Sequence, residues 1–489
     1  FVIAMWSFAA RKSNDSNKVR MAPTTVPTSN ELRTSFKSFW DKYSDRPDIG
    51  AMMLNNNAEE LEEADRHDIL SSLPCIKGKD AVDIGAGIGR FTTVLAQTAR
   101  HVLTTDFIDE FIRKNRENNS HLVNVDYAVG DAVNLQLKDD SVDFVFTNWI
   151  MMYMSDTETV QFILKCLTWL RPNGHAHLRE SCSEPSTGRK AASVSMHDAN
   201  ASNPTSYRFS SLYINLLRSV RVRDENGDTW KFNVRWSASV PTYIKRMSNW
   251  RQVHWLVQKV PADNNDSVPS FDDLLEKFSK TWNEVQKEWD SLLDGEEEVF
   301  TDEIVTSSLS SLSSLSSSDP SGIFVYTPRR ISPHLHINSH LLAEKFSSNI
   351  WNVEAEPYYY RTSLTKANTR KDQRVRFAWH PKFSQSIDYW TEKAAKFDAF
   401  VSTEFLTEND ADLYAVKRIL NENSPVVLIE PLEKIDADKI IERLSTAGLK
   451  NIRVRDVTDE ISTTLSSFNA KHNITIPSVK RWALIEATV

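Results

Sequence analysis

The residues best suited to chemistry in this sequence are three glycines and an acid with the spacing of a nucleoside-binding turn. Gly85, Gly87 and Gly89 follow the strand-like run Ala81–Ile84, and Asp106 lies about twenty residues further along the chain. Glycines allow backbone N–H groups to approach a ligand closely, and an acid at the tip of the next strand can bind both hydroxyl groups of a ribose. The pattern therefore predicts a nucleoside pocket.

The spacing of the glycines distinguishes between nucleoside ligands. A dinucleotide-binding turn has the pattern G-x-G-x-x-G, and its third glycine packs the helix against the sheet beside a pyrophosphate. Here the glycines follow G-x-G-x-G, Arg90 takes the place of the last glycine, and the acid Asp83 lies just before the first. This arrangement resembles that of S-adenosylmethionine (SAM) methyltransferases, whose cofactor has no pyrophosphate. SAM is therefore favoured, and a nicotinamide cofactor and a structural turn without a ligand are the alternatives.

Two further segments carry polar side chains that suit the same ligand. Asp131, within the run Val129–Ala132, can place a carboxylate beside the amino group of adenine. Asn148 follows Val142–Thr147, which reads as the fourth strand. Both strengthen the SAM interpretation, because a glycine turn alone is a weak signal.

These side chains need a sheet that brings strand ends together, and the sequence predicts a Rossmann-like α/β fold. Strand-like runs alternate with helix-like segments, a pattern typical of a mostly parallel sheet with helices on both faces. The expected strands are Ala81–Ile84, Val102–Thr105, Val123–Tyr127, Val142–Thr147 and His175–Arg179. Ligands lie beyond the carboxyl ends of such strands. Around that crevice we expect Gly85, Asp106, Asp131, Asn148 and Ser181.

A helix expected over Glu31–Tyr43 carries an aromatic stripe that includes Phe36, Phe39 and Trp40. Such stripes usually pack in a core, but the N-terminal helix of small-molecule methyltransferases often lies over the pocket. A lid role and a packing role are equally expected.

The composition restricts the class of protein. The 489 residues are enough for two or three domains. The net charge of -8 argues against a general nucleic-acid-binding protein, which would have a basic surface. The three cysteines have no paired spacing, so neither a zinc site nor a disulfide framework is expected. No apolar run approaches the roughly twenty residues that cross a bilayer, so we expect a cytoplasmic enzyme without a metal or a membrane partner.

Changes in composition divide the chain into four parts. These are a disordered N-terminus (1–30), a catalytic domain (31–260), a helix and Ser-rich linker (261–321) and a second α/β domain (322–489). The expected helix of the third part covers 271–293, and the low-complexity run covers 307–318. In the second α/β domain the counterpart of the glycine turn, Thr327–Pro333, has two prolines and no glycine. It is predicted to be a degenerate methyltransferase-like domain that binds no cofactor.

Taken together, several stretches resemble the phosphoethanolamine N-methyltransferases of plants and nematodes. The later stretches are more specific than a general SAM motif. The combination of an active first domain with a degenerate second domain resembles the nematode enzyme of the first methylation step. The matching stretches are Ala51–Leu54, Asp83–Thr92, Asp106–Asp109, Asn148–Asp156, Arg179–Cys182, Asn203–Arg208 and Trp255–Val260.

The resemblance implies methyl transfer from SAM to the amine of phosphoethanolamine, the first step towards phosphocholine, with a second methyltransferase for the later methylations. It assigns SAM to Gly85, Arg90, Asp106, Asp131, Ala132 and Asn148. It assigns binding of the acceptor phosphoethanolamine, the phosphobase, to Ser181, Ser186, Thr187, Arg189 and Tyr207. Protozoan relatives use a histidine near the position of Tyr153, so a histidine-based proton relay is not expected here.

Methyl transfer requires a neutral amine in line with the methyl group of the sulfonium. The ammonium group of phosphoethanolamine is expected to have a pKa near that of lysine, about 10. The site must therefore remove a proton from it or bind its rare neutral form. Tyr153 is the candidate for accepting the proton or orienting a water, with packing as its alternative role. Trp40 can cover the sulfonium and the amine by cation–π attraction. The alternative function is methylation of another small amine or of protein, with the C-terminal domain as an interaction module.

Overall fold

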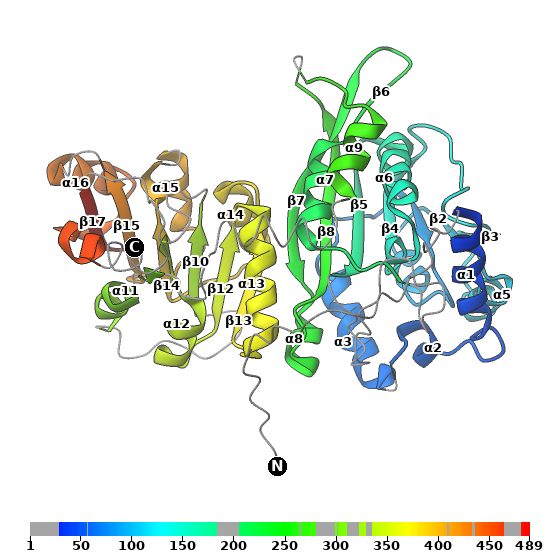
Figure 1. Ribbon diagram of the computed structural model, residues 1–489, viewed down its shortest axis with the longest axis horizontal. Coiled ribbons are helices and arrows are strands. Elements are labelled where there is room, and N and C mark those ends of the chain that lie inside the picture. Colours follow the sequence, from blue (N-terminus) through cyan, green and yellow to red (C-terminus); the bar gives the residue numbers. More distant parts are fainter. Residues whose placement is uncertain are drawn as a thin grey trace, which may run out of the picture.

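The computed structural model describes residues 29–55, 57–182, 205–263, 266–279, 299–300, 302–310, 322–328, 335–407, 410–432, 436–463 and 481–489. Most of these residues belong to two domains of the same architecture, whose strands join into one continuous sheet (Figure 1). The expected disorder of residues 1–30 lies almost wholly outside the described residues.

The sheet of the first domain has parallel strands followed by an antiparallel pair. The parallel strands are β1 (Asp80–Ile84), β2 (His101–Asp106), β3 (Val125–Val129), β4 (Val142–Thr147) and β5 (Leu170–Ser181), all expected from the sequence. Strands β7 (Thr229–Ser239) and β8 (Gln252–Pro261) complete the order β3-β2-β1-β4-β5-β8-β7, and β6 (Arg221–Arg223) pairs with β7. The side chains of β1 and β4 are mostly buried, as expected of central strands covered on both faces.

The strand register brings three predicted site residues to one edge of the sheet. Ile84, the last residue of β1, pairs with the residue before Asp106 on β2 and with the residue before Asn148 on β4. Gly85, Asp106 and Asn148 therefore lie next to one another at the carboxyl ends of the strands.

The helices of the first domain flank this sheet. They are α1 (Ser29–Asp41), α2 (Ile49–Met53), α3 (Ala58–Leu70), α4 (Thr92–Leu95), α5 (Asp109–Asn118), the 3-10 helix η1 (Met151–Tyr153), α6 (Asp156–Trp169), α7 (Ser210–Ser219), α8 (Pro241–Met247) and α9 (Phe271–Phe278). Helix α6 begins at a capping box, in which Ser155 and Glu158 each accept the backbone N–H of the other. This cap fixes the end of the chain segment that follows β4.

The second domain repeats the strand order of the first. Its strands are β10 (Ile323–Thr327), β12 (Ile350–Glu354), β13 (Val375–Trp379), β14 (Ala399–Thr403), β15 (Pro425–Leu432), β16 (Lys450–Asp456) and β17 (Arg481–Thr488). The order β13-β12-β10-β14-β15-β17-β16 matches the first sheet strand for strand. Its helices are α12 (Ser339–Phe346), α13 (Pro357–Arg370), α14 (Phe383–Glu392), α15 (Asp410–Val416) and α16 (Ala437–Thr446). The expectation of a second methyltransferase-like domain is confirmed.

This second domain retains an acid where the first has Asp106. Thr327, at the end of β10, pairs with Glu354 at the end of β12. The Glu354 carbonyl accepts the N–H of His380 at 3.2 Å, as the Asp106 carbonyl accepts the N–H of Gly130 at 2.9 Å. Most of the expected counterpart of the glycine turn, residues 329–333, lies outside the described residues.

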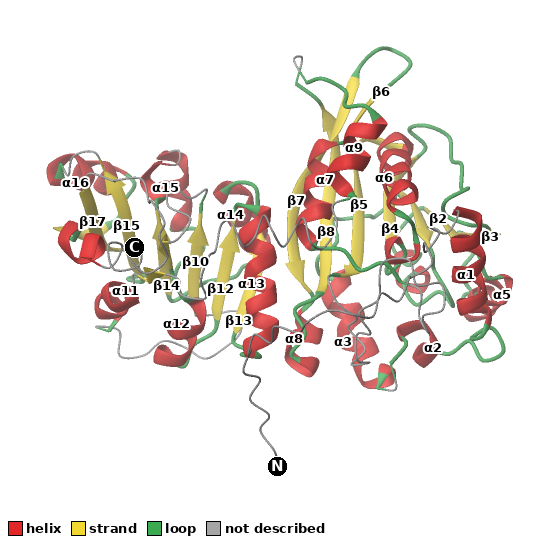
Figure 2. Cartoon of the chain, viewed as in Figure 1, coloured by secondary structure: helices red, strands yellow, loops and turns green. Residues whose placement is uncertain are grey.

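The two sheets meet edge to edge near the middle of the molecule (Figure 2). Strand β13 pairs antiparallel with β7 through Ala378 opposite Ala238 and Trp379 opposite Ser237. The buried indole of Trp250 also donates to the Val375 carbonyl at 2.9 Å. The second domain is therefore bonded to the first through backbone and side chains.

The first residues of the expected low-complexity run, 307–318, are helical in the structure. Residues 307–309 belong to α11 (Asp302–Leu309), because Val305 and Leu309 lie one helical turn apart and are both fully buried. Strand β9 (Val299–Phe300) pairs with β11 (Leu335–His336). The expected helix over 271–293 begins as α9, and residues 280–298 lie outside the described part. None of the helices that the structure describes is long and apolar enough to cross a membrane.

Candidate active site

The backbone after β1 forms the close turn that the glycines predict. Gly85, Gly87 and Gly89 have positive φ angles of 73°, 55° and 85°. A Cβ atom at Gly87 would lie 2.6 Å from the Met52 sulfur, and one at Gly89 would lie 2.2 Å from the Asn115 Oδ1 atom. The turn requires glycine at these positions, because other residues rarely adopt this backbone region and their side chains would collide.

The Asp106 carboxylate lies beside this turn. Its Oδ2 atom accepts the Gly87 N–H at 2.9 Å, and its Oδ1 atom accepts the Ile108 N–H at 3.0 Å. Burial raises the pKa of Asp106 to about 6. Each carboxylate oxygen retains capacity for another donor, which suits the two hydroxyl groups of a ribose.

The chain after β4 continues in a strained conformation. Trp149 has a φ angle of 59°, which is uncommon for a bulky residue, and its N–H donates to the Arg179 carbonyl at 2.8 Å. Directly before it, the Oδ1 atom of Asn148 is buried with no hydrogen-bond partner among the described residues. Such an unsatisfied acceptor indicates a place for a ligand donor, and strained backbone is often found at functional sites.

All the residues predicted to bind SAM line one cavity at these strand ends, namely Gly85, Arg90, Asp106, Asp131, Ala132 and Asn148. Trp40 and Tyr153, the candidates for the chemistry, line the same cavity. The structure thus brings together the whole predicted cofactor set and both catalytic candidates, and it leaves their roles as predictions.

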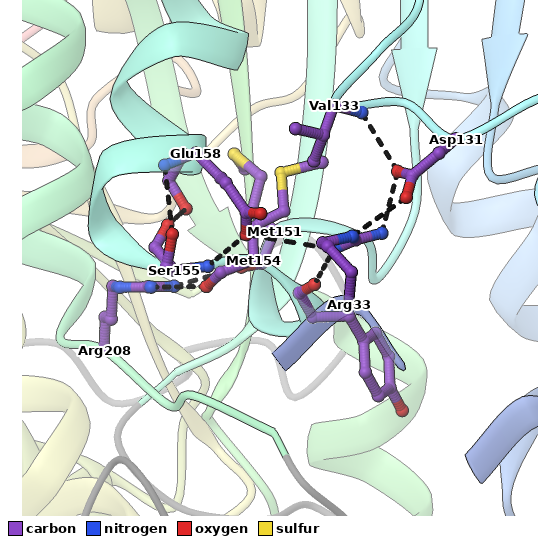
Figure 3. A network of polar contacts seen from close by, with 10 residues as sticks. Arg33, Asp131, Val133, Met151, Met154, Ser155, Glu158 and Arg208 are labelled. Atoms are coloured by element: carbon purple, nitrogen blue, oxygen red, sulfur yellow. Dashed lines mark hydrogen bonds and ion pairs between the residues drawn. The ribbon is translucent and has the colours of Figure 1, made fainter. Parts of the chain in front are cut away.

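Helix α1 contributes a cavity residue that was not predicted, Arg33. Its Nε and Nη2 atoms donate to the two oxygens of Asp131 at 2.8 and 2.7 Å (Figure 3). Its Nη1 atom donates to the Tyr153 carbonyl at 2.6 Å. Arg33 thereby ties α1 to the cavity wall, which favours a lid role for this helix. No spacing in the sequence indicates the contact, because the partners are 98 residues apart.

The aromatic stripe of α1 packs against Tyr153. The ring centroid of Tyr153 lies 5.4 Å from that of Trp40 and 6.0 Å from that of Phe36. Phe36 and Phe39 are buried, whereas Trp40 also faces the cavity. Helix α1 therefore has the packing role, and its residues at the cavity favour the lid role that the sequence left as the alternative.

Arg90 lines the cavity, but acids of α3 bind its charge. Its guanidinium lies 3.1 Å from Asp65 and 3.6 Å from Glu62. Asp65 also pairs at 2.8 Å with Arg179, which is fully buried. This network supports the cavity wall from behind, and a contact of Arg90 with SAM stays a prediction.

The structure describes only two of the five residues predicted to bind the phosphobase, Ser181 and Tyr207. Three of them lie outside the described residues, namely Ser186, Thr187 and Arg189. Ser181 is buried and accepts a hydrogen bond from the Gln252 amide, whose oxygen accepts the Trp149 indole N–H at 2.7 Å. Ser181 is not among the residues that line the cofactor cavity, but Trp149 connects it to that cavity.

Tyr207 lies on the segment that precedes α7. Burial raises the pKa of its hydroxyl, and its ring packs at the edge of the aromatic cluster around Tyr153. Its neighbours fix the segment, since the Ser206 N–H donates to the Met152 carbonyl at 2.7 Å and Arg208 pairs with Asp156 at 2.7 Å. Tyr207 therefore has a defined place next to the loop after β4, although it does not line the cofactor cavity.

The described residues contain no group of three or more His, Cys, Asp or Glu side chains placed to hold a metal ion. What the cavity offers is a glycine turn, a buried carboxylate suited to a ribose and an unsatisfied amide oxygen, at the carboxyl ends of a Rossmann-like sheet. These features fit SAM and define the class: a SAM-dependent methyltransferase. In agreement, residues 82–178 match the family model described as a methyltransferase domain.

The full length of the chain gives the family. It is 53% identical over 468 residues to phosphoethanolamine N-methyltransferase 1 of Caenorhabditis elegans, covering 95% of this chain and 97% of that protein. The chain therefore belongs to the phosphoethanolamine N-methyltransferase family. The structure of Haemonchus contortus phosphoethanolamine N-methyltransferase 1, in complex with phosphoethanolamine and S-adenosylhomocysteine, matches with a TM-score of 0.89 and 54% identity over 95% of this chain and 99% of that one.

Plant relatives match only part of the chain. Phosphoethanolamine N-methyltransferase 3 of Arabidopsis thaliana is 35% identical over 248 residues, which are 50% of this chain and 49% of that protein. The two-part layout is thus shared along its full length with the nematode proteins, as the sequence led us to expect.

Proposed function

We propose that this chain transfers a methyl group from SAM to the amine of phosphoethanolamine. The products are N-methylethanolamine phosphate and S-adenosylhomocysteine, the first step towards phosphocholine. The observation that carries the proposal is the 53% identity with the nematode enzyme along 95% of the chain.

In this proposal the cavity of the first domain holds the cofactor. SAM supplies, when bound, a methyl group activated by its sulfonium. Asp106 accepts hydrogen bonds from the ribose hydroxyl groups, and Asp131, oriented by Arg33, accepts one from the adenine amino group. Gly85, Arg90, Ala132 and Asn148 complete the cofactor set.

The phosphobase is held through its phosphate, by Ser181 and Tyr207 together with Ser186, Thr187 and Arg189. Lowering the pKa of the amine by one unit would contribute about 1.4 kcal/mol. Fixing the reacting groups in attack geometry contributes about 7–11 kcal/mol, so positioning by the phosphate is the larger effect. Tyr153 accepts the proton of the amine or orients a water that does, and Trp40 covers the cationic groups.

The second candidate function is methylation of another small amine or of a protein. The test supplies the purified chain with SAM and an equal mixture of phosphoethanolamine, ethanolamine and a peptide pool, and measures methylated products by mass spectrometry. Phosphoethanolamine should be methylated and ethanolamine should not, because ethanolamine lacks the anchoring phosphate. Comparable methylation of ethanolamine or of peptides would contradict the proposal.

We also propose that the chain acts in the cytoplasm and that a second methyltransferase completes the later methylations.

A further inference from the structure

Residues 149–154, which lie between β4 and α6, have three of their backbone N–H groups bound by one buried carboxylate. We call this segment the β4 loop. Glu180, near the end of β5, is fully buried, and its Oε1 atom accepts the N–H groups of Ile150 at 3.0 Å and Met151 at 2.7 Å. Its Oε2 atom accepts the N–H of Met152 at 3.1 Å. One side chain therefore fixes three consecutive peptide groups.

A backbone carbonyl of the β4 loop binds a residue of the cofactor cavity. The Tyr153 carbonyl accepts a hydrogen bond from Arg33, which also holds Asp131 at the cavity wall (Figure 3). The β4 loop therefore helps to hold Arg33, and with it α1, in place at the cavity.

The same loop binds the segment that carries Tyr207. The Ser206 N–H donates to a loop carbonyl at 2.7 Å, and Arg208 donates to the carbonyls of Met151 at 3.0 Å and Met154 at 2.7 Å. The residues on either side of Tyr207 are thus bonded to the backbone that Glu180 fixes from the opposite side.

We propose that Glu180 is a positioning residue for methyl transfer, which acts through the β4 loop to hold the cofactor side and the phosphobase side of the site at a fixed separation. The kinetic effects expected from this role rest on the proposed function. Tyr153, the candidate for accepting the amine proton, lies on the loop itself. A displaced loop would therefore disturb the cofactor side, the phosphobase side and Tyr153 together.

The second domain provides a matched control for this role. Glu430 of β15 is also fully buried, and it accepts the N–H groups of Phe405 at 2.7 Å and Leu406 at 3.0 Å. The residue before the first of these N–H donors has the same unusual backbone conformation in both domains, with φ angles of 59° at Trp149 and 58° at Glu404. The contribution of such a glutamate to the fold alone can therefore be measured at Glu430, where no predicted cofactor residue is involved.

The experiment compares Glu180→Gln with Glu430→Gln in the full-length chain. Glutamine keeps the shape of glutamate but offers one acceptor oxygen, so loop N–H groups lose a partner in both variants. Both variants should have a lower Tm. Only Glu180→Gln should lower kcat, by about 100-fold, the order expected when reacting groups are displaced by about 1 Å. It should also raise the KM for phosphoethanolamine and the Kd for SAM, whereas Glu430→Gln should leave all three within about two-fold of the wild type because the sites are distant.

Normal kinetics of Glu180→Gln at a reduced Tm would overturn the proposal, and so would equal losses of activity in the two variants. If Glu180→Gln does not fold, Glu180→Asp is measured in the same way against Glu430→Asp, with the same expected contrast. The Kd for SAM is measured by calorimetry without an acceptor. A chain that fails to methylate phosphoethanolamine would therefore contradict the proposed function, while the SAM affinities would still decide the role of Glu180.

Discussion

Arg33 of α1 and Asp131 of the loop after β3 form a bidentate ion pair at the wall of the cofactor cavity, with N–O distances of 2.8 and 2.7 Å. The side chains are only 18% and 21% exposed, so the pair is less screened than an ion pair on the surface. The carboxylate proposed to bind adenine is therefore oriented by a helix whose residues line the cavity.

Replacing Arg33 by methionine should raise the Kd for SAM by about 10-fold, because a hydrogen bond to a charged group contributes at least about 1.4 kcal/mol. Isothermal titration calorimetry measures the change. Arg113→Met is the control, since Arg113 pairs with Glu110 and Glu117 on the exposed face of α5. Unchanged or tighter binding of SAM to Arg33→Met would show that the pair does not hold the cavity closed.

The affinity for SAM should fall as the pH decreases from about 7 to about 5, because protonation removes acceptor capacity from Asp106. Burial raises the pKa of this carboxyl to about 6, so the ionised form predominates only above that pH. Asp106→Asn should bind SAM weakly throughout and lose most of this dependence. Calorimetric titrations across the range test the prediction, and a wild-type Kd that stays constant would argue against a ribose contact by this carboxylate.

Tyr153→Phe should lower kcat by about 100-fold, the lower range for loss of a group that transfers or directs a proton. The KM for either substrate should change little, because phenylalanine keeps the ring contacts with Trp40 and Phe36. Steady-state kinetics decide the matter. A variant with normal kcat would assign Tyr153 to packing alone.

Tyr207→Phe combined with Arg189→Ala should raise the KM for phosphoethanolamine much more than the KM for SAM. The two changes remove a hydroxyl donor and a guanidinium that would bind the phosphate. Initial rates at varied concentrations of each substrate measure both constants. Equal effects on the two KM values would place the phosphate elsewhere.

Much of the cofactor site was predictable because it depends on short-range patterns. The glycine turn, Asp106 and Asn148 follow directly from strand-like runs, and parallel strands bring their ends to one edge whatever the rest of the chain does. Arg33 was not predictable in this way. It is one charge on an amphipathic helix, and only the tertiary fold brings it to Asp131.

The same distinction applies to the second domain. The sequence predicts strands at Ile323–Tyr326, Ile350–Val353 and Ala399–Ser402, which the structure has as β10, β12 and β14, but it predicts no strand at β13. Its sequence contains Arg376, and two of its residues, Ala378 and Trp379, pair with β7 of the other domain. Pairing between strands so distant in sequence has no local signal. The three phosphobase residues at 186, 187 and 189 lie outside the described residues and stay predictions.

The central claim is that methyl transfer to phosphoethanolamine occurs in the cavity of the first domain and not in the second. The most direct measurement supplies SAM labelled with 13C in its methyl group, together with phosphoethanolamine, to the wild type, to Asp106→Ala and to Glu354→Ala, which changes the corresponding strand-end acid of the second domain. We predict 13C-labelled N-methylethanolamine phosphate from the wild type and from Glu354→Ala, and none from Asp106→Ala. Labelled product from Asp106→Ala, or its loss in Glu354→Ala with the fold intact, would contradict the account.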